Sequence, residues 1–119
     1  MTSSTSPTPT ADDAVDSPRK KVWFNGELVG ADQARVSVFD HGLLYGDGCF
    51  EGIRVYGGVI FKCQSHIDRI FRNAERMHMM RQGGDTFGRG GAGFPYSKDE
   101  IRRVMEQCVE ANGISDGYI

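Results

Sequence analysis

The 119-residue sequence predicts an α+β fold, in which an antiparallel sheet carries helices on one face. Two pairs of short apolar segments each flank a glycine-containing turn, a pattern typical of β-hairpins. Two segments with helical spacing of apolar residues come later in the chain. No expected strand is followed by a regular crossover helix and a parallel return, so the pattern argues against a doubly wound sheet.

The composition is that of one soluble domain. A formal net charge of −2 argues against nucleic-acid binding, and no run of roughly 18 to 20 apolar residues could span a membrane. The N-terminus lacks the apolar region of a secretion signal, so we expect a cytoplasmic location. The cysteines and histidines are too widely spaced for a disulfide framework or a metal site, and we expect no metal. These residues are Cys49, Cys63, Cys108, His41, His66 and His78.

Two segments of biased composition delimit the expected domain. Residues 1–19 have almost nothing to bury, so we expect a disordered tail followed by one domain over residues 20–119. A glycine-rich loop is expected at about 81–93. Within it, residues 88–93 match the G-x-G-x-x-G spacing of dinucleotide-binding loops, but no strand precedes them and no helix start follows. A flexible loop is therefore the better interpretation.

The first hairpin is predicted around Asn25-Gly26. Residues 22–24 and 27–29 flank this pair, which favours a two-residue turn between antiparallel strands. Residues 36–38 alternate between apolar and polar side chains and suggest another short extended piece. The glycine-spaced segment 40–48 follows without an assigned element.

A second hairpin is predicted where residues 50–56 and 59–63 flank Gly57-Gly58. The period-two rule gives one face of the first strand an unusual set of side chains, namely Phe50, Gly52, Arg54 and Tyr56. Either these residues pack in the ordinary way, or they form the wall of an apolar pocket. The gap at Gly52 is typical of a place that a ligand or another backbone approaches.

The first predicted helix follows this hairpin. Ser65 and Asp68 resemble a capping box, and apolar residues recur at helical spacing over residues 67–77. The arginines of this helix, other than Arg69, are expected on its solvated face.

The second predicted helix begins with a capping box formed by Ser97 and Glu100. Apolar residues recur with the spacing of one helix face over residues 101–109, and Asn112-Gly113 should end the helix. Residues 117–119 look like the opening of one more strand.

Three blocks of sequence resemble fold-type IV aminotransferases in their order and spacing: residues 22–27, 40–54 and 66–69. D-amino-acid aminotransferases and aminodeoxychorismate lyases share the Tyr-Gly-Asp-Gly and His-Ile-x-Arg portions of these blocks. The Phe-Glu-Gly-Ile-Arg portion instead resembles the branched-chain amino acid aminotransferases. The resemblance covers residues 21–77 and, more weakly, 94–119, and it implies the small N-terminal domain of such an enzyme.

The resemblance also implies roles for particular residues. Arg69 would bind the phosphate of pyridoxal 5′-phosphate, a role suited to a guanidinium with paired donors. Phe50 and Gly52 would line the pocket for a branched aliphatic side chain. Tyr118 would help to hold the substrate carboxylate, and Arg54 would support the same wall.

The implied activity is transfer of an amino group between Leu, Ile or Val and 2-oxoglutarate, with the cofactor as electron sink. Sites in this family lie at the interface of a homodimer or higher homo-oligomer, where Tyr45 would reach the neighbouring subunit's pocket. The catalytic lysine belongs to a large domain further along the chain. None of the lysines in this sequence matches that catalytic lysine. The lysines present are Lys20, Lys21, Lys62 and Lys98. We therefore expect an incomplete, inactive fragment that lacks the large domain.

Two alternatives remain open. One is another fold-type IV enzyme, either a D-amino-acid aminotransferase or an aminodeoxychorismate lyase. The other is a non-catalytic truncated paralogue that acts as a dimerisation module. A reading frame that continues past Ile119 into a lysine-bearing domain would separate an enzyme from such a module.

Overall fold

The computed structural model describes residues 17–80 and 94–119. These residues group into two compact units, one that ends at Arg35 and one that starts at Val36. The expected glycine-rich loop and most of the expected tail lie outside the described residues. At residues 17–19, which the sequence assigned to the tail, the chain makes a turn in which the Lys20 amide donates to the Ser17 carbonyl at 3.1 Å.

The first unit contains the first predicted hairpin, which is confirmed. Strand β1, Lys21–Phe24, pairs antiparallel with β2, Glu27–Gly30. Asn25 and Gly26 have φ angles of 51° and 100°, and two successive positive φ angles are what a tight hairpin turn requires. A short 3-10 helix, η2, spans Ala31–Gln33.

The segment between the two hairpins differs from the prediction. Residues 36–38 do not form a strand, and Val36 and Val38 are 62% and 65% exposed. The glycine-spaced segment instead contains a short helix, α1, over His41–Tyr45. Asp40 caps its start by accepting from the Gly42 amide at 2.8 Å, and Gly46 with a φ of 72° ends it.

The second hairpin is confirmed and belongs to a three-stranded antiparallel sheet. Its strands are β3, Arg54–Tyr56, and β4, Val59–Ile60, with Gly57 and Gly58 at positive φ between them. Strand β5, Gly117–Tyr118, lies on the other side of β3, so the order is β4-β3-β5. The predicted last strand is therefore present.

Strand β3 is shorter than the predicted strand. Ile53 exchanges backbone hydrogen bonds of 2.9 and 2.8 Å with Ile119, but residues 50–52 have no partner strand among the described residues. The return strand ends early because Lys62, with a φ of 50°, already precedes a helix. The predicted alternation nevertheless holds, since Ile53 and Val55 are only 6% and 0% exposed.

Helix α2 spans Cys63–Arg76 and starts before Ser65. The prediction of a capping box at Ser65 and Asp68 is therefore wrong. Lys62 is the N-cap of α2 and makes no side-chain cap hydrogen bond. Ser65 therefore lies inside the first turn, not at the cap position where a hydroxyl accepts from a free amide. The Asp68 carboxylate instead accepts from the Lys98 ammonium at 2.9 Å.

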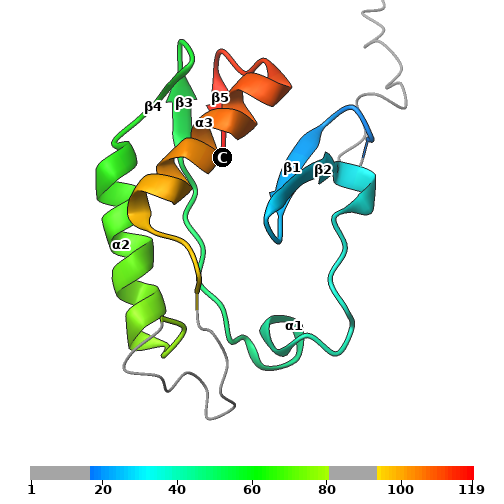
Figure 1. The fold of residues 1–119 in the computed structure, drawn as a ribbon, viewed down its shortest axis with the longest axis vertical. Helices are drawn as coiled ribbons and strands as arrows, with labels where there is room; N and C mark the ends of the chain where they lie inside the picture. The colour runs from blue at the N-terminus through cyan, green and yellow to red at the C-terminus, as the bar shows by residue number, and fades with distance from the viewer. Residues whose placement is uncertain (1–16, 81–93) are drawn as a thin grey trace, which may run out of the picture. The chain divides into compact units, whose positions relative to one another are not determined.

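Helix α3, Lys98–Asn112, has the predicted capping box. The Ser97 hydroxyl accepts from the Glu100 amide at 3.1 Å, and the Glu100 carboxylate accepts from the Ser97 amide at 2.7 Å. Gly113 ends the helix with a φ of 60°. Helices α2 and α3 pack side by side beside the sheet (Figure 1).

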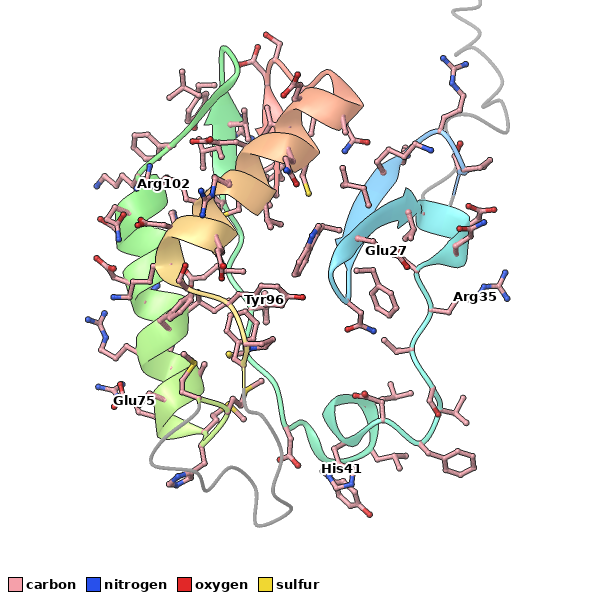
Figure 2. The ribbon with its side chains drawn as sticks, in the orientation of Figure 1. Glu27, Arg35, His41, Glu75, Tyr96 and Arg102 are labelled. Carbon is pink, nitrogen blue, oxygen red and sulfur yellow. The ribbon has the colours of Figure 1, made fainter. Side chains whose placement is uncertain are left out.

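The two helices are also tied by polar contacts and by the chain that joins them. Arg102, labelled on α3 in Figure 2, donates to the Gln64 side chain of α2 at 2.6 Å. Just beyond α2, Met80 forms an isolated parallel bridge with Phe94, and the Phe94 amide donates to the Met79 carbonyl at 2.9 Å. The chain thus leaves α2 and returns towards α3 at neighbouring points.

The sheet and both helices share one core. Its buried residues come from the segment before β3, from α2 and from α3, and partly buried apolar residues pack around them. The buried members are Ile53, Cys63, Ile67 and Met105, and the surrounding ones are Ile60, Phe71, Ile101 and Ile119. Burial of each large side chain stabilises the fold by about 1.5–3 kcal/mol. The predicted α+β class is confirmed, and no helix within residues 17–80 and 94–119 has the length and apolar character needed to cross a membrane.

Candidate functional site

A charged cluster joins the segment before β3 to helix α2. His66 and Arg69 are three residues apart on α2, so their side chains lie on one face of the helix. Both contact the carboxylate of Glu51: His66 Nδ1 lies 2.7 Å from Oε1, and Arg69 Nε lies 2.9 and 3.0 Å from Oε1 and Oε2. The Arg69 Nη2 atom also donates to Oε1. We call these three residues the Glu51 cluster.

The members of the Glu51 cluster are buried to very different degrees. The Glu51 side chain is 9% exposed and the Arg69 side chain is 55% exposed. A carboxylate withdrawn from water is costly unless it is paired and hydrogen-bonded. Hydrogen bonds from Arg69, and then from His66, lower the pKa of Glu51, and the same carboxylate raises the pKa of Arg69. The cluster therefore keeps the Glu51 carboxylate and the Arg69 guanidinium charged.

A second cluster forms where β3 pairs with β5. Arg54 is opposite Tyr118 in the sheet register, and its guanidinium carbon lies 4.5 Å from the centre of the Tyr118 ring and 4.9 Å from that of Tyr56. A hydrogen bond with Tyr118 is the main reason why the pKa of Arg54 is raised. The Arg54 Nε atom is buried without a hydrogen-bond partner in the described part of the chain. We call these residues the Arg54 cluster.

The other residues singled out from the sequence lie on exposed backbone. Phe50 is 89% exposed, and a methyl group added at Gly52 would meet nothing within 4 Å. Tyr45, on α1, is 69% exposed and contacts the His41 ring edge-to-face at 5.1 Å. The structure thus brings Arg54 and Tyr118 together, pairs Arg69 with Glu51, and leaves Phe50 beside open space.

Glu51 is the site residue that the sequence reasoning missed. The period-two rule puts Glu51 on the strand face opposite Arg54, where no functional residue was expected. A usable signal was present, because alternation puts Glu51 on the same face as Ile53 and Val55, both of which are buried. A carboxylate on a core-facing side of a strand needs a cation near it.

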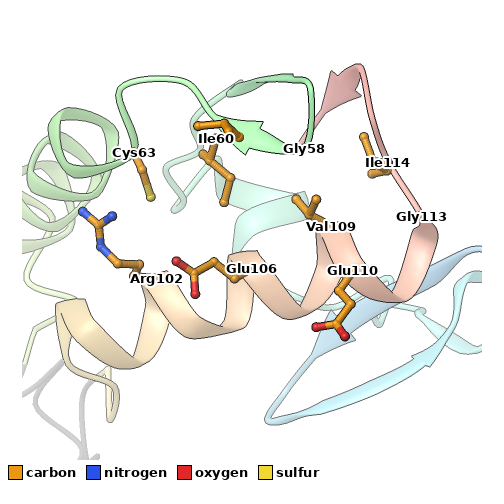
Figure 3. Close-up of a pocket in the computed structure, with 10 residues that line it drawn as sticks. Gly58, Ile60, Cys63, Arg102, Glu106, Val109, Glu110, Gly113 and Ile114 are labelled. Atoms are coloured by element: carbon orange, nitrogen blue, oxygen red, sulfur yellow. The ribbon is translucent and has the colours of Figure 1, made fainter.

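The second unit has two hollows that the residues of these clusters do not line. A groove of about 550 Å³ runs between β4 and α3, with Cys63 and Arg102 at one end and Gly113 at the other (Figure 3). A smaller apolar pocket of about 200 Å³ lies beside α2, and its lining includes Cys49, Phe94 and Ile101. None of the residues that the sequence singled out for cofactor or substrate lines either hollow. Hollow volume alone therefore does not mark the candidate site.

Comparison with known proteins relates the chain to one family, and the matched segment includes both clusters. The sequence profile of the family described as amino-transferase class IV matches residues 48–119. The chain is 37% identical over 102 residues to a branched-chain-amino-acid aminotransferase of Pseudomonas aeruginosa, which covers 82% of this chain. A Methanocaldococcus jannaschii protein provisionally named as the same enzyme is 40% identical over 99 residues, or 83% of this chain. A D-alanine aminotransferase of Listeria monocytogenes is 33% identical over 99 residues.

The fold is similar to that of a solved enzyme as well. The crystal structure of a branched-chain aminotransferase from Thermoproteus uzoniensis with norvaline matches 82% of this chain with a TM-score of 0.66 and 32% identity. The chain spans only about 30% of the length of that structure and 29–30% of the relatives named above. The family match covers more than half of the chain and includes Glu51, Arg54, Arg69 and Tyr118. The chain therefore belongs to the class IV aminotransferase family.

Proposed function

We propose that the chain is the small N-terminal domain of a pyridoxal-phosphate-dependent branched-chain aminotransferase, which exchanges an amino group between Leu, Ile or Val and 2-oxoglutarate. The branched-chain relatives and the Phe-Glu-Gly-Ile-Arg segment support this reading. The structural observation that carries the proposal is Arg69, a half-exposed cation that pairs with the Glu51 carboxylate, whose side chain is 9% exposed. Three free cysteines, Cys49, Cys63 and Cys108, suit a reducing compartment, and we propose the cytoplasm.

The chemistry of Arg69 fits a phosphate group. Its contacts to Glu51 use the Nε and Nη2 atoms, which form one edge of the guanidinium. The Nη1 atom takes no part in these contacts, and the side chain is 55% exposed. Arginine is suited to phosphate because its donors are directed and always charged. When bound, pyridoxal phosphate supplies an electron sink for amino-group transfer.

The substrate would lie against the exposed face that includes Phe50 and Gly52. An exposed aromatic ring next to an open glycine offers an apolar surface to a branched aliphatic side chain. The Arg54 guanidinium and the Tyr118 hydroxyl lie together and can attract and hydrogen-bond a carboxylate. Tyr45 would contribute to the site of a second subunit in a homodimer or larger oligomer.

A D-amino-acid aminotransferase is the second candidate, because the Listeria relative matches the same share of this chain as the branched-chain relatives do. The two candidates differ in the donor they accept, L-leucine or D-alanine. The family relation to both enzymes supports either reaction.

The test uses the protein expressed from its natural reading frame. Absorbance with pyridoxal phosphate, before and after borohydride, is expected to reveal one reduced lysine adduct, and transfer from L-leucine to 2-oxoglutarate is expected to exceed transfer from D-alanine. A larger rate with D-alanine favours the second candidate. If there is neither an adduct nor transfer, the non-catalytic dimerisation module is the better explanation.

The variant Arg69→Ala checks the cofactor assignment. Loss of hydrogen bonds to a charged group costs about 1.5–3 kcal/mol, so pyridoxal phosphate should bind roughly tenfold to a hundredfold more weakly. Arg72→Ala is the matched control, because Arg72 is an exposed arginine of the same helix. Equal affinity in the two variants would exclude Arg69 as the phosphate ligand. Fluorescence titration of each variant provides the measurement.

A further inference from the structure

We propose that Glu51 is a positioning residue for the cofactor phosphate, since it holds one edge of the Arg69 guanidinium so that the other edge is presented to the anion. This inference rests on the proposed function, in which Arg69 binds that phosphate. Glu51 itself is not expected to touch the cofactor.

The anchoring role follows from where Glu51 sits. It precedes β3 on the same side of the chain as the buried residues Ile53 and Val55, and its own side chain is 9% exposed. The carboxylate is therefore largely withdrawn from solvent, and its contacts with His66 and Arg69 tie it to α2. Arg69 has a long side chain with many rotamers and is 55% exposed, so it would sample many orientations by itself.

The contact geometry restricts the Arg69 guanidinium in both position and rotation. Nε reaches both carboxylate oxygens, at 2.9 and 3.0 Å, and Nη2 donates to Oε1. Contacts from two nitrogens to two oxygens fix the plane of the guanidinium, whereas a single contact would let it rotate. His66 Nδ1 lies 2.7 Å from the same Oε1 atom and adds a further contact that restrains the carboxylate. The edge of the Arg69 guanidinium that does not contact Glu51 therefore points in one fixed direction.

Glu51 has two opposing effects on phosphate binding, one electrostatic and one entropic. Its negative charge weakens the attraction of Arg69 for a phosphate, whereas its hydrogen bonds remove the cost of ordering the arginine when phosphate binds. Arg69 is more than half exposed, so solvent screens the charge effect. Orientation is therefore the larger effect, and loss of Glu51 should weaken phosphate binding.

The experiment compares pyridoxamine 5′-phosphate with pyridoxamine, two probes that differ in the phosphate and that cannot form a Schiff base with surface lysines. Calorimetric titration of the protein from its natural reading frame gives the phosphate preference, which is the dissociation constant of pyridoxamine divided by that of pyridoxamine 5′-phosphate. In Glu51→Gln this ratio should fall on the order of tenfold relative to wild type, with pyridoxamine affinity unchanged. Asp68→Asn is the matched control, because it removes a carboxylate of α2 that pairs with Lys98 and Gln64.

The outcomes separate this inference from the proposed function. If wild type prefers the phosphorylated probe and Arg69→Ala loses that preference while Glu51→Gln keeps it, the positioning role is overturned and the proposed function stands. If wild type shows no preference for the phosphorylated probe, both are overturned. Glu51→Asp keeps the negative charge but moves it away from Arg69, because the side chain is shorter. Its phosphate preference is measured beside that of Glu51→Gln, and the melting temperature of each variant is measured as well. Loss of preference in a folded Glu51→Asp supports the role, and a wild-type preference in it overturns the role.

Discussion

Glu51 illustrates how a single residue can couple stability to pH. Its pKa is lowered in the folded state, first by hydrogen bonding to Arg69 and then to His66. A carboxyl group with a depressed folded pKa contributes stability above its unfolded pKa of about 4.3, and that contribution is lost as the pH falls through the folded pKa. The stabilisation is therefore complete at neutral pH and absent in strong acid.

The variant Glu51→Gln tests this linkage. Its unfolding free energy should lie below that of wild type at pH 7, and the gap should shrink as the pH falls below about 4.3, because the wild-type carboxyl becomes protonated. Urea unfolding at a series of pH values measures both free energies. A gap that is constant from pH 7 to pH 3 would contradict an ionised, paired Glu51.

The contact between Glu51 and Arg69 also shows what the sequence could not provide at the residue scale. The resemblance identified Arg69 by its place in His-Ile-Asp-Arg, but its partner lies 18 residues earlier in the chain. A contact over that separation depends on how the segment before β3 lies against α2. Arg54 and Tyr118 are similar, because the register of β3 with β5 decides that they meet.

Among the elements, those with a strong local signal were predicted correctly. Asn25-Gly26 and Gly57-Gly58 permit the positive φ angles of a tight turn, so both hairpins follow from two residues each. Helix α1 was missed because five residues are too few for a periodic pattern, although Asp40 and Gly46 are standard end signals. The strand β3 was predicted too long because pairing with distant β5, and not local alternation, sets its length.

The two serines proposed as helix caps provide a matched test at this scale. Ser97 caps α3 through the Glu100 amide, so Ser97→Ala should lower the unfolding free energy by about 1 kcal/mol. Ser65 is exposed inside the first turn of α2, and Ser65→Ala should change stability by less than about 0.5 kcal/mol. Chemical denaturation of both variants followed by circular dichroism measures the difference. Equal losses would mean that the capping hydrogen bond contributes nothing specific.

For the molecule as a whole, the surface is the unusual property. Several large apolar side chains between the two hairpins are more than half exposed, and this concentration is typical of surfaces that contact other protein. They are Val36, Val38, Phe39, Leu43, Leu44, Tyr45 and Phe50. The proposed enzyme would need such a surface to build its sites between subunits.

We therefore expect the 119-residue chain to self-associate. Size-exclusion chromatography with light scattering should give a mass above that of the 13.1-kDa monomer, rising with concentration. Replacement of Phe50, the most exposed of these residues at 89%, by Ser should shift the distribution towards monomer. A monodisperse monomer at all concentrations would show that this surface needs no partner.

The bridge between Met80 and Phe94 has a consequence for how such a domain can evolve. For a flexible connection whose ends are fixed to each other, a doubling of length costs only about 0.6 kcal/mol of closure entropy. A change in the number of residues between these two positions is therefore expected to leave the Glu51 cluster in place. For protein engineering, the same point is a permissive insertion site for an epitope or a fluorescent reporter.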